Sequence, residues 1–292
     1  MNPPDQRAAQ FEEHRGHLKA VAYRMLGSLS EAEDAVQDAW LRYSRSDTSD
    51  VENLGGWLTT VVARICLNLL RARRSRRELP SSLRLPDPVV TRAEETDPAE
   101  QALVADAVGM AMLVVLETLS PAERVAFVLH DVFGVPFDQV APIVGRTPTA
   151  ARQLASRARR RVHQSPAQPD ADLRQQRAVV SAFQAAARSG DFQALLAVLD
   201  PDVVVRADFG ARRATQENRG AVSVAENAMS FAPLAGFARP ALVNGTAGLV
   251  IVRDGRPLAV LGFTVRGGKI VELDILGDPA RLRHLDVSIL DD

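Results

Sequence analysis

The segment LSPAERVAFVLHDVFGVPFDQVAPIVGRTPTAARQLASRARRRV, residues 119–162, contains the start and stop signals of several short helices. Ser120 and Glu123, with a proline directly after the serine, have the pattern of a capping box at a helix start. Gly145 ends a short helix, and Thr147, again followed by a proline, caps the next one. Two helices joined by a tight glycine turn, of which the second is basic, predict a helix-turn-helix.

The last helix of this segment has an apolar face and a basic face. Alanines and larger apolar residues recur at helical spacing on the side that should pack inward: Ala151, Leu154, Ala155, Ala158 and Val162. The opposite side and the preceding turn carry groups able to contact base edges and phosphates: Arg146, Thr147, Thr149, Arg152, Gln153, Ser156, Arg157 and Arg160. A solvated basic face is the alternative, but the turn, the two caps and the one-sided charge favour a DNA-recognition helix.

A second basic stretch, residues 53–77, also lacks acidic residues and is predicted to be helical. The whole chain has a formal net charge of −1, so two acid-free segments with six arginines each, residues 145–162 and 53–77, are unusual features. One basic helix can be an ordinary solvated face, whereas two in separate helical domains predict a protein that contacts two sites on one DNA. The candidate DNA-contacting residues of the second stretch are Asn53, Trp57, Arg64, Asn68, Arg71 and Arg74.

The segment SEAEDAVQDAWLRYSR, residues 30–45, points to a different kind of partner. Ser30 and Glu33 have the spacing of a capping box, and the apolar side of the helix should comprise Ala32, Ala35, Val36, Ala39, Trp40 and Tyr43. On the other side a leucine lies among acidic and amide residues: Asp34, Gln37, Asp38 and Leu41. This arrangement fits either an ordinary surface or a protein-binding patch with an apolar centre and polar flanks.

The chain of 292 residues is long enough for two or three domains, and changes in composition mark their boundaries. Helical patterns occupy residues 8–77 and 101–163, and a proline- and acid-rich linker, 78–100, separates them. Over residues 172–287, helical patterns precede apolar runs that are separated by dipeptides typical of β-hairpins: Asn244-Gly245, Asp254-Gly255 and Gly267-Gly268. The predicted fold class is therefore multidomain, with two all-α domains followed by an α+β domain.

Several features argue against other classes of protein. The single cysteine, Cys66, cannot form an internal disulfide, and its place in an apolar helical series predicts a buried structural thiol. The polar N-terminal segment does not resemble a signal peptide, and no apolar run reaches the ~18 residues of a membrane span, so we expect a cytoplasmic protein. The five histidines lack a metal-ligand spacing. Neither a phosphate-binding glycine loop nor an activated nucleophile is evident, so we expect no enzyme and no cofactor. The candidate pocket groups in the α+β domain are Arg206, Asp208 and Glu226.

Three segments together resemble a bacterial sigma factor of the extracytoplasmic-function group: YRMLGSLSEAEDAVQDAWLR, GGWLTTVVARICLNLLRARRSRR and the 119–162 segment. The resemblance covers residues 8 to 163. It implies that residues 8–77 bind the RNA polymerase core and the −10 promoter element, and that residues 101–163 bind the −35 element. It places Asp34, Gln37, Asp38 and Leu41 where the family docks on the β′ clamp helices, and it implies the β flap as a further contact.

Residues 172–287 resemble a SnoaL-like α+β cone-fold domain, which in one sigma subfamily replaces a separate anti-sigma protein. That subfamily's linker motif, Trp-Leu-Pro-Glu-Pro, appears here as RLPDP, residues 84–88. Its Asp-Gly-Gly-Gly-Lys loop appears as DFGAR, 208–212, and its Asn-Pro-Asp-Lys-Leu motif as GDPARL, 277–282. The resemblance implies a regulatory contact between linker and domain through Leu85, Pro86, Pro88, Asp208 and Arg212, and leaves open a small ligand of this domain.

Two functions fit these observations. The first is a sigma factor whose activity is modulated by its own C-terminal domain. The alternative is a one-component regulator, in which a helix-turn-helix is fused to a small-molecule sensor or enzyme domain. The feature that separates them is the N-terminal helical domain with its acidic face and its second basic helix, since a simple regulator needs neither.

Overall fold

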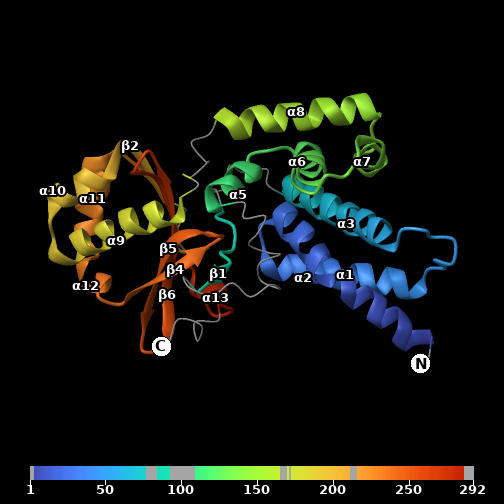
Figure 1. Cartoon of the computed structure of the whole chain (residues 1–292), viewed down its shortest axis with the longest axis horizontal. Helices are drawn as coiled ribbons and strands as arrows, with labels where there is room; N and C mark the ends of the chain where they lie inside the picture. The colour runs from blue at the N-terminus through green and yellow to red at the C-terminus, as the bar shows by residue number, and fades with distance from the viewer. Residues whose placement is uncertain are drawn as a thin grey trace. The chain divides into compact units, whose positions relative to one another are not determined.

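The computed structural model describes residues 3–76, 84–92, 109–164, 170, 172–210 and 216–285. They fall into two compact units, coloured along the chain in Figure 1. The helical unit comprises residues 3–76 and 115–162. The α+β unit comprises residues 84–92 and 109–114 together with the described residues from 163 to 285. No helix within these described ranges is both long and apolar enough to span a membrane.

The first three helices of the helical unit pack around a common apolar core. On the second of them Ala32, Ala35, Val36, Ala39 and Tyr43 are buried, as predicted, and Trp40 is half-buried beside the ring of Phe11. Asn53 caps the third helix, because its side-chain oxygen accepts the N–H of Gly56 at 2.9 Å. The helices are α1 (Pro3–Leu26), α2 (Leu29–Arg45) and α3 (Leu54–Arg76).

The capping box predicted at Ser30 is wrong. Helix α2 already begins at Leu29, and its N-cap residue, Ser28, makes no side-chain cap. The Glu33 carboxylate instead binds two cations of α1, Arg15 at 2.5 Å and Lys19 at 2.9 Å. Hydrogen bonds from Arg15 and Lys19 hold the pKa of Glu33 below its ordinary value, against the effect of burial. Glu33 therefore ties α2 to α1 and does not close its own helix start.

The predicted helix-turn-helix is formed by α7 and α8. The capping box before it is confirmed, since the Ser120 hydroxyl accepts the N–H of Glu123 at the start of α6. Gly145 ends α7 with a φ of +68°, a conformation that favours glycine. Thr147 then accepts the N–H of Ala150 at 3.3 Å and caps α8. The elements are α6 (Pro121–Phe127), a π-helical turn η1 (Val128–Val132), α7 (Phe137–Val144) and α8 (Pro148–Gln164).

The two halves of the helical unit pack against each other: α3 contacts α6 and α7, and α1 contacts η1. Phe133, directly after η1, makes part of this contact. Its ring lies edge-on to His17, 5.3 Å between centroids, and the guanidinium of Arg24 lies 5.1 Å from its centre. Cys66 of α3 is fully buried, as predicted, and burial raises the pKa of its thiol to about 12. The thiol is therefore protonated at neutral pH and serves as a small core residue.

The α+β unit is built on a mixed sheet whose described strands have the order β1-β4-β5-β6-β7-β2-β3. Strands β4 to β7 form the predicted antiparallel meander, because Asn244, Asp254 and the glycines of the three turns adopt positive φ. Strand β2 lies parallel to β7, which makes the sheet mixed. The strands are β1 (Val90–Thr91), β2 (Leu199–Asp208), β3 (Gln216–Arg219), β4 (Ala238–Val243), β5 (Thr246–Arg253), β6 (Arg256–Arg266) and β7 (Lys269–Leu276).

Helices α9, α10 and α11 cover one face of this sheet, as Figure 1 shows. Because side chains alternate along a strand, Leu273 of β7 faces these helices and Asp274 faces the other side. Val90, Met110 and Leu282 pack on that second face. Two helical regions followed by helices on a mixed sheet confirm the predicted fold class. The helices are α5 (Met110–Glu117), α9 (Leu173–Ser189), α10 (Phe192–Val198), α11 (Ala221–Ser230), α12 (Ala232–Ala235) and α13 (Pro279–Leu282).

Candidate functional site

The linker segment 84–92 extends the sheet of the α+β unit at its edge. Strand β1 pairs antiparallel with β4, so that Val90 lies opposite Val243. One residue earlier, the N–H of Val89 donates to the side-chain oxygen of Asn244 at 3.2 Å. The carbonyl of Val89 accepts the backbone N–H of Asn244 at 2.8 Å. Backbone hydrogen bonding therefore holds the linker as an added edge strand.

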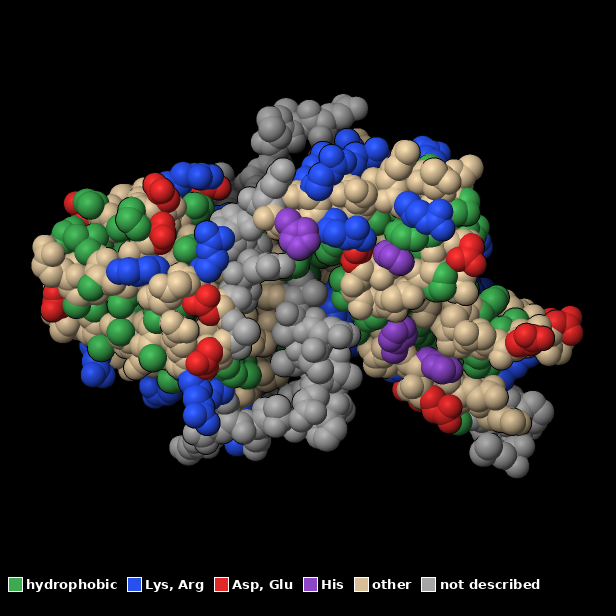
Figure 2. Space-filling model, turned by 45° about the horizontal axis from the view of Figure 1, so that its top comes forward, with side chains coloured by type: hydrophobic (Ala, Val, Ile, Leu, Met, Phe, Trp, Pro, Cys, Tyr) green, Lys and Arg blue, Asp and Glu red, His purple; other side chains and the backbone are tan. Residues whose placement is uncertain are grey.

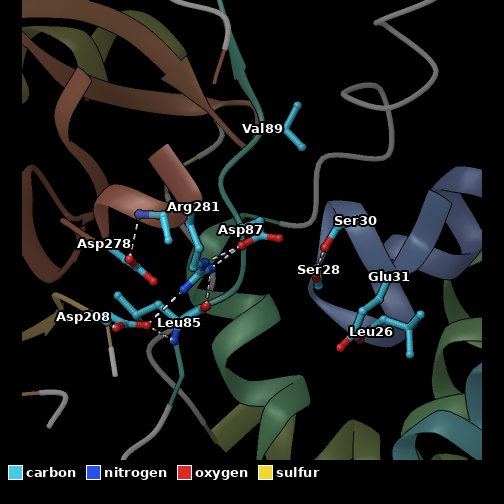
Figure 3. Close-up of polar contacts among 12 residues, drawn as sticks. Leu26, Ser28, Ser30, Glu31, Leu85, Asp87, Val89, Asp208, Asp278 and Arg281 are labelled. Atoms are coloured by element: carbon cyan, nitrogen blue, oxygen red, sulfur yellow. Dashed lines mark hydrogen bonds and ion pairs between the residues drawn. The ribbon is translucent and has the colours of Figure 1, made fainter. Parts of the chain in front are cut away.

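Arg281 of α13 binds the same linker through its guanidinium group (Figure 3). Its Nε donates to the carboxylate of Asp87 at 2.6 Å, and Nη2 donates to the carbonyl oxygen of Leu85 at 2.7 Å. Nη1 donates to the carboxylate of Asp208 at 3.0 Å, and that carboxylate also accepts the N–H of Leu85 at 3.3 Å. The Arg281 side chain is 11% exposed, so these charges interact largely out of water. We call Leu85, Asp87, Asp208 and Arg281 the linker clasp.

Two loops of the α+β unit pack closely to build the clasp. Asp208 ends β2, and its backbone oxygen accepts the N–H of Gly277 at 2.8 Å. A Cβ on Gly210, which has a φ of +88°, would lie 2.8 Å from the carboxylate carbon of Asp278. A Cβ on Gly277 would lie 2.5 Å from the ring of Phe209. Only glycine permits this approach at both positions, and so residues 208–210 lie against Gly277 and Asp278.

The predicted regulatory residues take different places around the clasp. Leu85 and Asp208 meet in it, and Pro86 and Pro88 are buried on either side of Asp87. Arg212 lies outside the described residues. The sequence reasoning did not identify Asp87 or Arg281 as members of the site. The GDPARL motif was the available signal for Arg281, but it did not reveal which carboxylates the arginine would bind.

A second buried charge cluster lies on the same face of β2. Arg206 binds Glu272 at 2.9 Å and Asp274 at 3.0 Å. Desolvation raises the pKa of Asp274 to about 6, because burial together with the nearby Glu272 outweighs the attraction of Arg206. Glu226 lies exposed on α11, which packs on the opposite face. The three pocket candidates, Arg206, Asp208 and Glu226, therefore do not converge on one site. The described residues also contain no cluster of His, Cys, Asp and Glu suited to a metal ion.

The predicted DNA-contacting face of α8 is open to solvent, and Figure 2 shows basic side chains gathered over this helix. Its buried face is Ala151, Leu154, Ala155, Ala158 and Val162, as predicted. Several of these basic side chains also have contacts inside the helical unit. Arg157 binds Glu123 at 3.0 Å, and the guanidinium of Arg152 lies 5.6 Å from the ring centre of Phe137. The exposed residues are Arg146, Thr147, Thr149, Arg152, Gln153, Ser156, Arg157 and Arg160.

Glu123 connects the start of α6 with the recognition helix. Its carboxylate accepts the backbone N–H of Ser120 at 3.1 Å and the Ser120 hydroxyl at 2.7 Å. It also binds Arg157 at 3.0 Å and Arg161 at 3.2 Å, while its own side chain is 8% exposed. Burial alone would raise the pKa of Glu123. The Ser120 hydrogen bonds and the two arginines together lower it by more, so the pKa is below its ordinary value. Sequence reasoning found its capping role and missed its link to α8.

The remaining predicted residues lie on exposed faces of α2 and α3. On α3, Arg64, Asn68, Arg71 and Arg74 are exposed and share one face, and Trp57 is half-buried with its ring 6.1 Å from that of Tyr43. Asn53 is exposed at the N-cap of α3. On α2 the four docking candidates are all exposed: Asp34, Gln37, Asp38 and Leu41. Leu41 is 40% exposed, which makes it an exposed large apolar side chain flanked by polar ones.

Comparison with known proteins gives matches at both the sequence and the structure level. The chain matches the family descriptions Sigma-70 region 2 over residues 10–76 and Sigma-70, region 4 over residues 109–162. It is 41% identical over 289 residues to the ECF RNA polymerase sigma factor SigJ of Mycobacterium tuberculosis (strain ATCC 25618 / H37Rv), covering 93% of this chain and 91% of that protein.

Two further matches cover nearly the whole chain. The probable ECF RNA polymerase sigma factor SigI of Mycobacterium tuberculosis (strain CDC 1551 / Oshkosh) is 34% identical over 295 residues, 99% of each protein. The crystal structure of the extracytoplasmic function sigma factor SigJ of Mycobacterium tuberculosis superposes with a TM-score of 0.75 at 37% identity. That superposition covers 94% of this chain and 98% of the other, so the similarity includes the α+β unit as well as the helices.

Proposed function

Because the chain belongs to the ECF RNA polymerase sigma factors, we propose that its C-terminal domain controls, within the same chain, how the two promoter-binding regions are held. A sigma factor is a non-enzymatic subunit that directs the RNA polymerase core to promoter DNA. Residues 10–76 and 109–162 match the two sigma regions. The α+β unit is additional to them, and the linker clasp is the observation that supports a regulatory role for it.

The clasp holds the middle of the segment that joins the two sigma regions. Helix α3 ends at Arg76 and region 4 begins at residue 109, so the clasped residues 84–92 lie between them in the chain. A domain tethered to its own target can meet it at an effective concentration of roughly millimolar order. Even a modest contact then persists in the free protein. Holding the linker restricts which relative positions of the two regions the chain can reach.

The two promoter elements are far apart compared with the helical unit. Elements at −10 and −35 are separated by about 25 base pairs, or roughly 85 Å of B-DNA at ~3.4 Å per base pair. Helix α3, with 23 residues, is roughly 35 Å long. Since α3 contacts α6 and α7 directly, this packing has to open before both elements can be bound at once. The clasp favours the packed arrangement, and binding of polymerase shifts the population toward the open one. Transcription with the clasp intact and with it broken tests this proposal.

The exposed face of α2 is the proposed contact for the β′ clamp helices, and region 4 is the proposed contact for the β flap. Leu41 provides an exposed apolar centre, with Asp34, Gln37 and Asp38 around it. Protein interfaces commonly combine such a centre with a polar rim, and charged rims guide the approach of the partner. This face therefore supports docking on a basic partner surface.

Replacing Asp38 with arginine and Leu41 with aspartate should weaken binding to the polymerase core about tenfold or more, since the variant loses the apolar centre and reverses a rim charge. Both side chains are exposed, so the helix content measured by circular dichroism should not change. Glu13→Arg on α1 is a control with the same charge reversal at another exposed position. A pull-down titration that gives one affinity for wild type and the double variant rules this face out.

The exposed face of α3 is proposed to capture the unpaired −10 strand. Extruding a base from the stack costs a few kcal/mol, which stacking and polar contacts must offset. The half-buried ring of Trp57 is positioned beside Tyr43, and the cap residue Asn53 lies one turn before it. The proposed contacts are Asn53, Trp57, Arg64, Asn68, Arg71 and Arg74.

The exposed face of α8 is proposed to read the −35 element, with Arg152 and Gln153 as base-contacting residues. Losing a base contact costs about 1–3 kcal/mol and relaxes specificity at one position, whereas losing a phosphate contact weakens binding to all sequences alike. We therefore expect Arg152→Ala and Gln153→Ala to change the ranking of −35 variants, and Arg160→Ala to lower all affinities together. If wild type and both variants rank a set of mutated −35 duplexes identically, the assignment of these two residues is wrong.

The one-component regulator is disfavoured by the region 2 match over residues 10–76. A simple regulator needs a helix-turn-helix and a sensor, and it has no use for a second DNA-binding helical domain. The full-length similarity to sigma factors, which covers 93% of this chain, leads to the same conclusion.

A further inference from the structure

The helical unit contains a pocket of about 510 Å³ between the C-terminal half of α3, the connection from α5 to α6, and the last turns of α8. Pockets of this size accommodate small molecules. Its charged lining consists of Arg73, Arg74, Glu117, Glu123, Arg124 and Arg161. We propose that this pocket binds a small phosphate-bearing anion, such as pyrophosphate or a nucleotide.

Positive charge exceeds negative charge in this lining, with four guanidinium groups against two carboxylates. Arg161 shares Glu123 with Arg157, which lies outside the lining, so one carboxylate serves two cations. Arg74 is exposed and has no ion-pair partner among the described side chains. Arg73 binds Glu31 of α2, and adding Glu31 and Arg157 to the count leaves the excess of two positive charges unchanged. An anion in the pocket would neutralise the positive charge that the described carboxylates of the lining and their ion pairs leave in excess.

Arg124 adds a buried cation to the wall of the pocket. It is 2% exposed and binds Glu117 at 2.9 Å through Nη1. Its Nε and Nη2 are buried and have no hydrogen-bond partner in the described part of the chain. A guanidinium group carries five N–H donors, and leaving buried donors unpaired is costly. A nearby anion would offset this cost through its charge, which makes Arg124 an independent indication that the pocket takes an anion.

A phosphate group suits this lining better than a single carboxylate. Guanidinium groups bind phosphate oxygens with paired, charge-assisted hydrogen bonds, and several of them can share the three terminal oxygens. A phosphate monoester carries a charge of about −1.5 to −2 near neutral pH. That charge matches the excess of two guanidinium groups, whereas a carboxylate would balance only one. The volume leaves room for a second phosphate or a nucleoside.

A ligand at this site would act on the sigma module without involving the linker clasp. One wall of the pocket belongs to region 2 and the remaining walls belong to region 4. A ligand that contacts residues of both regions therefore stabilises the arrangement in which the two regions are packed together. Arg74 is also one of the proposed −10 contacts, so an anion bound there would compete with DNA. The binding itself does not depend on the clasp or on the proposed role of the C-terminal domain.

Calorimetric titration of the full chain with pyrophosphate and with adenosine monophosphate, at constant ionic strength, tests the proposal. We expect saturable binding of at least one of them. Arg74→Ala and Arg161→Ala should each weaken it about tenfold or more, because each removes a charge-assisted contact. Arg71→Ala and Arg160→Ala are matched controls, since both arginines are exposed on the same two helices but do not line the pocket. The two control variants should bind the small anion with the same affinity as the wild type.

Three outcomes would overturn the proposal. The first is no saturable heat with either anion. The second is equal weakening in the controls, which would mean diffuse attraction to a basic surface. The third is loss of binding to duplex DNA in Arg74→Ala and Arg161→Ala without any binding of the small anions, which would assign the arginines to the DNA backbone alone. Arg74→Lys and Arg161→Lys keep the charge but lose the planar fork, so an intermediate affinity supports the site if an alanine variant fails to fold.

Discussion

Replacing Arg281 with alanine should free the linker from the α+β unit and raise promoter output at limiting polymerase. The guanidinium group is 11% exposed and holds Asp87, Asp208 and the carbonyl of Leu85. Removing one partner of a buried ion pair costs about 3–5 kcal/mol, because the remaining charges stay buried without compensation. Here two carboxylates would remain. With the clasp lost, residues 84–88 should detach before the domain unfolds.

Hydrogen exchange measures this release directly. In the wild type the N–H groups of Leu85 and Val89 donate to Asp208 and Asn244, and they should exchange slowly. In Arg281→Ala both should exchange much faster, while the strands β5 to β7 keep their protection. Arg283→Ala is the matched control, because Arg283 is exposed two residues after Arg281, at the C-cap of the same short helix. Equal exchange in the two variants would show that Arg281 does not hold the linker.

Asp87→Ala breaks the clasp from the linker side and leaves the core of the α+β unit untouched. It should therefore reproduce the effect of Arg281→Ala on transcription even if the arginine variant loses stability. The measurement is run-off transcription from the cognate promoter at matched polymerase concentration. If linker exchange rises in both variants and transcription stays at the wild-type level, the clasp exists without controlling the sigma module.

Local signals were sufficient to predict the ends of the region 4 helices. Ser120, Gly145 and Thr147 each act on the backbone within four residues, so their effect depends little on the rest of the fold. The same signal gave a wrong prediction at Ser30, because Glu33 finds two cations on α1 and does not cap its own helix. Tertiary ion pairs compete with local caps, and the sequence pattern of a capping box does not reveal that competition.

The clasp could be predicted only in part, because its residues are far apart in the sequence. Arg281 binds Asp87 and Leu85 across separations of 194 and 196 residues, and no local pattern encodes such pairs. Family resemblance indicated the loops but not Arg281. The short strand β1, Val90–Thr91, has no periodicity to detect and is ordered by its pairing with β4. The hairpins were predictable because their turns depend on local sequence: Asn244 and Asp254 each stand directly before a glycine and adopt the positive φ of a tight turn.

Replacing Glu123 should destabilise the helical unit, because one buried carboxylate closes the capping box of α6 and binds two arginines of α8. Loss of an N-terminal cap costs about 0.5–2 kcal/mol. Arg157 and Arg161 are about half exposed, so each ion pair adds only about 0.5–1 kcal/mol. Glu123→Ala loses both contributions and should cost roughly 2–3 kcal/mol. Glu123→Gln keeps a residue suited to the capping box and loses the charge, so it should cost only about 1 kcal/mol.

The pH dependence identifies the part of this cost that comes from charge. The pKa of Glu123 is below its ordinary value of 4.5 in the folded chain. Such a group stabilises the fold above its unfolded pKa, and the stabilisation is lost as pH falls through the folded pKa. The stability gap between wild type and Glu123→Gln should therefore be full at pH 7 and shrink below pH 4.5. The pKa of Glu33 is also lowered, but Glu33 is present in both proteins, so its contribution cancels in the difference between their stabilities.

Urea unfolding followed by tryptophan fluorescence is the appropriate measurement, because both tryptophans of the chain, Trp40 and Trp57, lie in the helical unit. A gap that stays constant from neutral to acidic pH would mean that the Glu123 carboxylate acts only as a neutral cap. A gap that closes would show that its charge also positions α8. The −35 reading helix would then depend on a residue that cannot itself reach DNA, since Glu123 is buried beneath the arginines it holds.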